Sequence, residues 1–214
     1  MKKSILSILL SILLGGALAH GATITVGAGE SIQTAVNGAS SGDEIVLTYP
    51  GQYLEDVLVN GKAITIRSSS GTDNSIGGSL TVSNLPAGGS MSLIDLDIRG
   101  NFRTNGIPST AKLNVARTKI ETFARFSGDG TYNLVNLEIG SFLDANATKL
   151  HLKRCTIANT LDFLLTSDSV GNKTQLVFLQ STIKGKLTSR ATKTWLGYSN
   201  LEETSLQGTL EIVG

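Results

Sequence analysis

Six segments of eight residues repeat through the middle of the chain and decide its fold. They read MSLIDLDI (91–98), LNVARTKI (113–120), YNLVNLEI (132–139), LHLKRCTI (150–157), LVFLQSTI (176–183) and TWLGYSNL (194–201). Every segment has a large apolar residue at its third and last positions, five of the six begin with one, and the sixth position is apolar or small. The last residues of successive segments are 18 to 26 residues apart.

This pattern predicts stacked β-strands. Alternate side chains of a strand point to one face, so the apolar positions of each segment lie on the same side. A repeat of about 20 residues with this alternation and no helical spacing is typical of a solenoid built from strands. A single rung, meaning one complete turn of the solenoid, cannot bury its apolar side alone. We therefore expect a parallel β-helix whose rungs bury a continuous apolar interior.

The composition fits a single globular domain and narrows the classes of partner. The chain has 214 residues, of which 16% are charged and 40% hydrophobic. Its net charge is +1 and becomes −1 if Lys2 and Lys3 are removed, which gives no electrostatic reason to expect nucleic acid, an anionic membrane or a polyanion as an obligatory partner. The single cysteine, Cys155, excludes an internal disulfide or a cysteine metal cluster and is expected inside the solenoid.

The first residues have the features of a secretory signal peptide. Lys2 and Lys3 precede the apolar run 5–14, and Ala17-Leu18-Ala19 provides small residues for cleavage. We expect a signal peptide over 1–19 and a β-helix domain over 20–214, located in the periplasm or outside the cell. The apolar run is too short for a membrane span, and no later stretch is apolar enough to be one.

The domain is expected to begin with a strand and a short capping helix over 23–42. Ile32, Ala35, Val36 and Ala39 are spaced as one apolar helix face, and Glu30 is expected in the first helical turn. This helix is predicted to cover the N-terminal end of the solenoid. First rungs over 43–90, regular rungs over 91–201 and a C-terminal end over 202–214 are predicted to follow, with polar loops at 68–78 and 164–175.

The opening of the domain also resembles a known superfamily. The run SIQTAVNGASSGDEIVL, followed by PGQYLEDVLVNGKAITIRSSSG, is similar to the N-terminal opening of the pectin-lyase-like right-handed parallel β-helices. The motif positions are Gly42, Asp43, Pro50, Gly51, Tyr53 and Glu55. The resemblance implies the right-handed β-helix fold but no activity, because one fold supports unrelated chemistries. The later signatures of pectin methylesterases and polygalacturonases are absent from this sequence.

Several outward positions carry opposite charges on successive rungs. Asp97, Lys119 and Glu138 stand one residue before the end of their segments. Asp95 and Arg117 stand three before the end, and Arg99 and Glu121 one after it. Neighbouring rungs are about 4.8 Å apart. We interpret these columns as ion pairs that fix the register between rungs.

A second outward column is a candidate functional site. It contains Arg103, Arg125, Asp144 and Asp162 on four consecutive rungs. Like charges at this spacing repel unless a ligand or ion lies between them. Two carboxylates can hold Ca²⁺ or divide the roles of acid and base, and two arginines can bind a sugar carboxylate. The alternative is that these side chains extend into solvent without a function.

The last regular rung provides further candidates. Trp195 and Tyr198 are expected to face outward, where they would stack on a sugar ring or shield the open end of the solenoid. We expect residues 202–214 either to fold over the last rung or to leave it for association with another chain. Self-association through the C-terminal rung is therefore a prediction.

Three functions remain open from the sequence. The first is a secreted, non-catalytic β-helix that binds glycans or forms an extracellular scaffold. The second is a small lyase or hydrolase of acidic polysaccharides that uses the column from Arg103 to Asp162, with Ca²⁺ as the only cofactor considered. The third is a purely structural unit that assembles with copies of itself.

Overall fold

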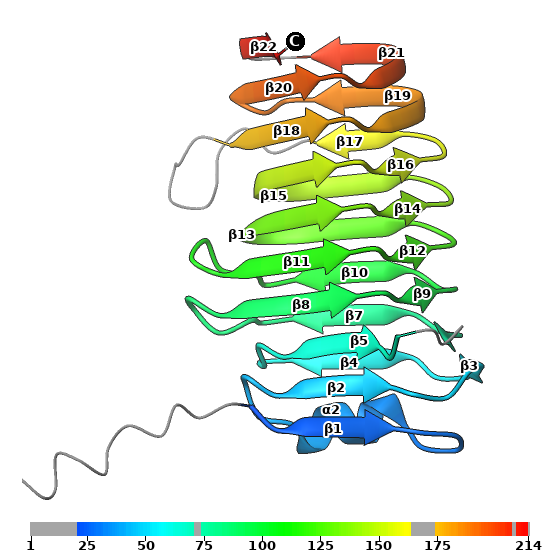
Figure 1. The fold of residues 1–214 in the computed structure, drawn as a ribbon. Coiled ribbons are helices and arrows are strands. Elements are labelled where there is room, and N and C mark those ends of the chain that lie inside the picture. Colours follow the sequence, from blue (N-terminus) through cyan, green and yellow to red (C-terminus); the bar gives the residue numbers. More distant parts are fainter. Residues whose placement is uncertain (1–20, 71–73, 164–173, 207–208, 214) are drawn as a thin grey trace, which may run out of the picture.

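The protein is a parallel β-solenoid of about eight turns, with one short helix near its N-terminus. The computed structural model describes residues 21–70, 74–163, 174–206 and 209–213. Figure 1 shows strands of successive rungs lying directly above one another and running in the same direction. The predicted parallel solenoid with an N-terminal helix is confirmed.

Each complete rung contributes to three ladders of paired strands, which form three faces. Face 1 consists of β1 (Thr23–Val26), β2 (Glu44–Leu47), β5 (Thr65–Ser68), β8 (Ser90–Ile94), β11 (Lys112–Ala116), the second parts of β13 (Ala124–Val135) and β15 (Leu143–Lys153), β18 (Gln175–Leu179), β20 (Lys193–Gly197) and β22 (Thr209–Val213).

Face 2 follows a bend in the chain and is made mostly of two-residue strands. It consists of β3 (Gln52–Tyr53), β6 (Ser75–Ile76), β9 (Asp97–Ile98), β12 (Lys119–Ile120), β14 (Glu138–Ile139), β16 (Thr156–Ile157) and the first parts of β19 (Thr182–Ser189) and β21 (Asn200–Leu206). Face 3 consists of β4 (Val57–Asn60), β7 (Leu80–Ser83), β10 (Phe102–Asn105), the first parts of β13 and β15, β17 (Leu161–Phe163) and the second parts of β19 and β21.

The register between rungs is the one expected from the sequence. Ile120 pairs with Ile98 on one side and with Ile139 on the other, and the same column continues to Leu201. It also extends backward to Ile76 and Tyr53. The region 68–78 was predicted to be only a polar loop, and this is wrong because it contains strand β6.

The inward columns form one continuous core. Ile98, Ile120, Ile139, Ile157 and Ile183 are all fully or almost fully buried. Aromatic side chains fill the interior beneath face 3, where the Phe102 and Phe126 rings lie 5.3 Å apart and the Phe126 and Tyr132 rings 5.1 Å apart. Because every rung buries its apolar side against its neighbours, the outward side chains are held at fixed positions.

The helix α2 (Ile32–Gly38) lies at the N-terminal end, with Ile32 and Val36 buried in the core (Figure 1). Ser31 is its N-cap and accepts a hydrogen bond from the Thr34 amide at 3.1 Å. Glu30 is not in the first helical turn as predicted, because the helix begins after Ser31. The carboxylate that meets the helix N-terminus is Glu55, whose Oε1 accepts from the Ile32 amide at 2.6 Å.

The residues of the opening motif hold the first rungs together. The Tyr53 hydroxyl donates to the Val26 carbonyl at 2.7 Å and is buried in the core. The Asp43 carboxylate accepts from the amides of Ala22 and Ser40, each at 2.7 Å. These contacts, together with Glu55 on the helix, give the motif a structural role.

Some predictions fall on residues outside the described part of the chain. These are the signal peptide over 1–19 and most of the predicted loop over 164–175, of which only Thr174 and Gln175 are described. Among the described residues, no helix is long and apolar enough to cross a membrane.

Candidate functional site

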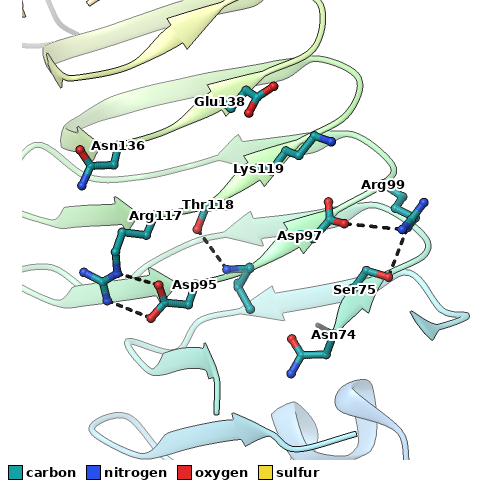
Figure 2. Close-up of a pocket in the computed structure, with 11 residues that line it drawn as sticks. Asn74, Ser75, Asp95, Asp97, Arg99, Arg117, Thr118, Lys119, Asn136 and Glu138 are labelled. Carbon is teal, nitrogen blue, oxygen red and sulfur yellow. Dashed lines mark hydrogen bonds and ion pairs between the residues drawn. The ribbon is translucent and has the colours of Figure 1, made fainter. Parts of the chain in front are cut away.

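A depression of about 540 Å³ lies on the outside of the solenoid, where face 1 bends into face 2. Residues from four successive rungs line it, and most of them are polar or charged (Figure 2). They are Asn74, Ser75, Asp95, Leu96, Asp97, Arg99, Arg117, Thr118, Lys119, Asn136 and Glu138. We call this surface the bend depression.

From the rung of Asp95 onward, the bend is made by one residue in the left-handed conformation on each of six successive rungs. Six such residues stand in one column, none of them glycine: Asp95, Arg117, Asn136, Arg154, Gln180 and Tyr198, with φ between 45° and 56°. This conformation costs a residue with a Cβ roughly 1–2 kcal/mol. Strain of this kind persists only where the surrounding structure enforces it, and it concentrates at functional sites.

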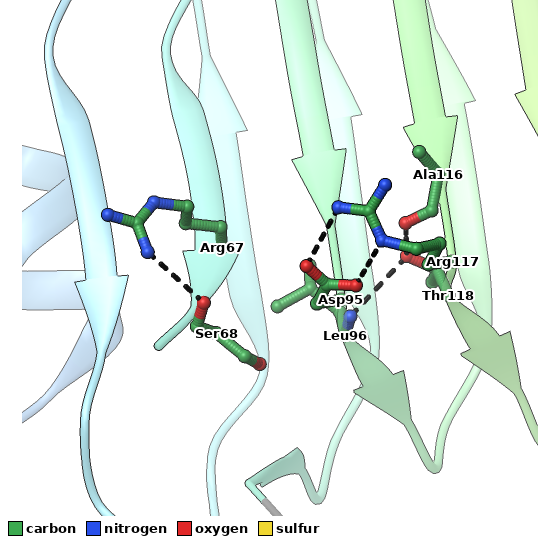
Figure 3. Close-up of polar contacts among 7 residues, drawn as sticks. All are labelled: Arg67, Ser68, Asp95, Leu96, Ala116, Arg117 and Thr118. Atoms are coloured by element: carbon green, nitrogen blue, oxygen red, sulfur yellow. Dashed lines mark hydrogen bonds and ion pairs between the residues drawn. The ribbon is translucent and has the colours of Figure 1, made fainter. Parts of the chain in front are cut away.

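Small polar side chains inside the solenoid stabilise this bend. The Thr118 hydroxyl accepts from the Leu96 amide of the preceding rung at 3.5 Å and donates to the Ala116 carbonyl at 3.0 Å (Figure 3). Ser181 repeats the arrangement, with its hydroxyl accepting from the Cys155 amide at 2.9 Å. Where the sixth position of a segment is threonine or serine, its hydroxyl completes the backbone hydrogen bonding at the bend, whereas Leu96 and Leu137 fill the same position with buried apolar side chains.

One strong ion pair borders the depression. Arg117 donates to both carboxylate oxygens of Asp95, at 2.6 and 2.9 Å, as predicted from their column (Figure 3). The hydrogen bond from Arg117 holds the pKa of Asp95 below its ordinary value. Both residues also adopt the left-handed backbone conformation, so the pair joins two neighbouring bends.

Asp97 is the carboxylate of the depression whose pKa is raised rather than lowered. Its Oδ1 is buried and makes no hydrogen bond, and its Oδ2 lies 3.7 Å from Arg99 Nη2. Burial, followed by repulsion from Glu121, raises the pKa of Asp97 despite the opposing effect of Arg99 and Lys119. A carboxyl group with a raised pKa in a surface depression is a candidate for binding or proton transfer.

The other two basic side chains of the depression are only loosely paired with carboxylates, although Arg99 Nε also donates to Ser75 Oγ at 3.2 Å. Arg99 lies 3.6 Å from Glu121, and Lys119 lies 3.8 Å from the same carboxylate. Lys119 was predicted to pair with Asp97 and Glu138, and its strand does pair with theirs. Among the described residues its ion pair is instead with Glu121, on its own rung, because the long lysine side chain reaches along the strand.

These contacts leave hydrogen-bonding groups available to a ligand. Separations of 3.6–3.8 Å exceed the usual length of a direct hydrogen bond. Arg99 and Lys119 can therefore donate to an incoming carboxylate or hydroxyl, and Glu138, which has no ion pair in the described part of the chain, can accept from a hydroxyl. The depression thus combines donors and acceptors suited to a polar ligand with many hydroxyl groups.

The candidate column predicted on face 3 is formed as expected, but its members have different partners. Arg103, Arg125, Asp144 and Asp162 are paired in register on four rungs. Arg125 forms an ion pair with Asp144 at 2.9 Å. The Arg103 guanidinium makes a cation–π contact, 5.0 Å from the centre of the Phe123 ring. This contact offsets part of the repulsion expected between Arg103 and Arg125.

The other predicted site residues lie on the outside near the C-terminal rungs. Tyr198 is 80% exposed, and Trp195 is half-buried with the Lys193 ammonium 5.6 Å from the centre of its ring. Within the described residues, no three His, Cys, Asp or Glu side chains are grouped to hold a metal ion. Calcium at Asp144 and Asp162 stays a prediction.

The sequence interpretation missed two features. It treated Asp97 and its neighbours as register-fixing ion pairs, and nothing in the charge columns indicated a depression or an unpaired carboxylate oxygen. It also missed the parallel pair of Phe123 and Phe142, whose rings lie 4.9 Å apart and 2° from parallel. The signal was present, because both phenylalanines stand three residues after a segment end.

Comparison with known proteins adds no assignment to this geometry. The sequence matches none of the protein-family models searched, and a search of curated proteins also found no match. Function must therefore be inferred from the bend depression and the outward columns.

Proposed function

We propose that this chain is a secreted glycan-binding β-solenoid that binds acidic polysaccharide in the bend depression. The observation that carries the proposal is a depression in which Arg99 and Lys119 are loosely paired beside the carboxylates of Asp97 and Glu138. Guanidinium and ammonium groups suit the carboxylate of a uronic acid, and carboxylates suit sugar hydroxyls.

The repetition of the rungs also favours a polymer. Side chains from four successive rungs line one depression. A linear ligand that lies along the solenoid would therefore contact polar side chains at regular intervals, one set on each rung. The N-terminal segment resembles a signal peptide, which supports export to a compartment where polysaccharides are accessible.

Retention on a glycan array that includes oligogalacturonates and neutral oligosaccharides tests the proposal. We expect retention of the acidic oligosaccharides and a loss of about tenfold in affinity for Lys119→Ala, because a hydrogen bond to a charged group contributes about 1.5–3 kcal/mol. Lys112→Ala is the matched control, since Lys112 is an exposed lysine of β11 outside the depression. Equal affinities for the two variants would show that the depression is not the site.

A second candidate function is cleavage of an acidic polysaccharide, and the raised pKa of Asp97 favours it. A carboxyl group that keeps its proton at higher pH can act as a general acid. A screen for new unsaturated or reducing ends, with and without Ca²⁺, tests this function. Activity abolished in Asp97→Asn would place the chemistry in the depression, whereas loss in Asp144→Ala or Asp162→Ala would place it on face 3.

A purely structural role makes a different prediction. A scaffold would retain no glycan and would form oligomers that grow with concentration. Sedimentation measures this, and a monomer at high concentration would count against self-association through the C-terminal rung.

A further inference from the structure

The outer surface of face 3 carries a short stack of two aromatic rings and one cation. The Phe123 and Phe142 rings are parallel, and Phe142 is 36% exposed. The Arg103 guanidinium, from the rung before Phe123, lies over the Phe123 ring. Arg103 and Phe142 come from the two rungs on either side of the Phe123 rung.

The far face of Phe142 meets a different neighbour. On the rung that follows, the residue aligned with Phe142 is Thr160, whose side chain is smaller than a phenylalanine ring. Two residues later on the same rung, Asp162 pairs in register with Asp144. Asp162 therefore occupies the position on this side of the stack that Arg103 occupies on the other. Diagonal neighbours of this kind lie about 7–8 Å apart, within reach of long side chains.

The register between these rungs therefore makes Asp162 the diagonal neighbour of Phe142. The negative face of an aromatic ring attracts cations, as the contact of Arg103 with Phe123 shows. No ion pair or hydrogen bond involves the Asp162 side chain among the described residues, and Asp144 already pairs with Arg125. Lys186, on the next rung, pairs with Glu203 at 3.0 Å. Among the residues that the structure describes, no cation pairs with Asp162 or lies over the Phe142 ring.

We infer that Phe142 and Asp162 bind a protonated amino group, and that the ligand is a glycan of amino sugars with free amines. The ammonium group contacts the exposed ring and donates to the Asp162 carboxylate, while the apolar face of the sugar packs against Phe142. The inference rests on the proposed glycan-binding function and extends it to a second face of the solenoid and to a ligand of opposite charge.

Titration calorimetry with glucosamine oligomers, in a mildly acidic buffer that keeps the amines protonated, tests the inference. We expect binding by the wild type, a loss of about tenfold or more in Asp162→Asn and in Phe142→Ala, and weak binding of the N-acetylated oligomers. Glu202→Gln is the control, because it removes an exposed carboxylate of β21 two rungs away and should bind as the wild type does.

The outcomes separate this site from the bend depression. Binding of oligogalacturonate without binding of glucosamine oligomers would overturn the face 3 inference and leave the proposed function intact. Binding of neither would overturn both. Equal binding by wild type, Asp162→Asn and Phe142→Ala, or equal affinity for the acetylated oligomers, would also refute the inference.

Discussion

Replacement of Asp97 by asparagine should stabilise the protein at neutral pH. The Asp97 Oδ1 atom is buried without a hydrogen bond, and burial raises the pKa of this carboxyl group in the folded protein. A raised folded pKa means that the stability contributed by the protonated form is present at low pH and is lost as pH rises through the folded pKa. At neutral pH the carboxylate charge is fully solvated in the unfolded chain but partly buried in the folded protein, where it is less favourable.

The size of the effect follows from the contacts of this side chain. Asparagine keeps a polar atom at the buried position but removes its charge, and burying a charge costs more than burying a neutral group. The substitution also removes the weak 3.7 Å ion pair with Arg99. We expect a gain of about 1 kcal/mol, which raises the Tm by roughly 2–4 °C for a chain of this length.

Thermal unfolding followed by circular dichroism across a pH series measures this gain. The gain should shrink as the pH is lowered and Asp97 in the wild type takes up its proton. Glu138→Gln, in the same outward column, should change the Tm by less than about half as much. A lower Tm for Asp97→Asn at neutral pH, or a gain that does not vary with pH, would show that the buried carboxylate is favourable in its charged form.

The remaining predictions concern the core, the bend and the surface. Ile139→Ala should cost about 2–5 kcal/mol in denaturant unfolding, because Ile139 is 1% exposed and lies between two rungs; a cost below about 1 kcal/mol would contradict the packing. Ser181→Ala should cost about 1–3 kcal/mol, since it leaves the buried Cys155 amide without an acceptor; an unchanged unfolding midpoint would exclude that role. The Cys155 thiol, whose pKa burial raises, should react with a thiol reagent only after unfolding, and rapid labelling of the folded protein would contradict its burial. Asp95→Asn should lower stability by up to about 1 kcal/mol at neutral pH, because the depressed pKa of Asp95 contributes stability that is lost as pH falls through the folded pKa; an equal loss in acid would show another cause.

The register of the solenoid could be predicted from the sequence because it depends on alternation alone. The pairing of Ile120 with Ile98 and Ile139 follows once the apolar positions are aligned, and a slip of one residue would expose them. The strand at Ile76 was missed because only two residues of it pair and polar residues surround it.

The candidate site was less predictable because it depends on backbone geometry. Residues such as Arg117 do not indicate a left-handed conformation, since most residues with a Cβ avoid it. When the bend is not known, the charges at Asp97 and Lys119 predict only the exposed face of a flat sheet and no depression. On face 3 the charge column was aligned correctly. The contact of Arg103 with the Phe123 ring was not predicted, because Phe123 carries no charge and stands in a different column.

Mapping of a bound oligogalacturonate by NMR tests the central claim most directly. The backbone amide signals of the bound and free protein locate the ligand without any substitution. If the bend depression is the site, the largest shifts fall on residues 95–99 and 117–121, and those of 102–105 on face 3 stay in place. Shifts confined to face 3 or to the C-terminal rungs, or no shifts at saturating ligand, would contradict the claim.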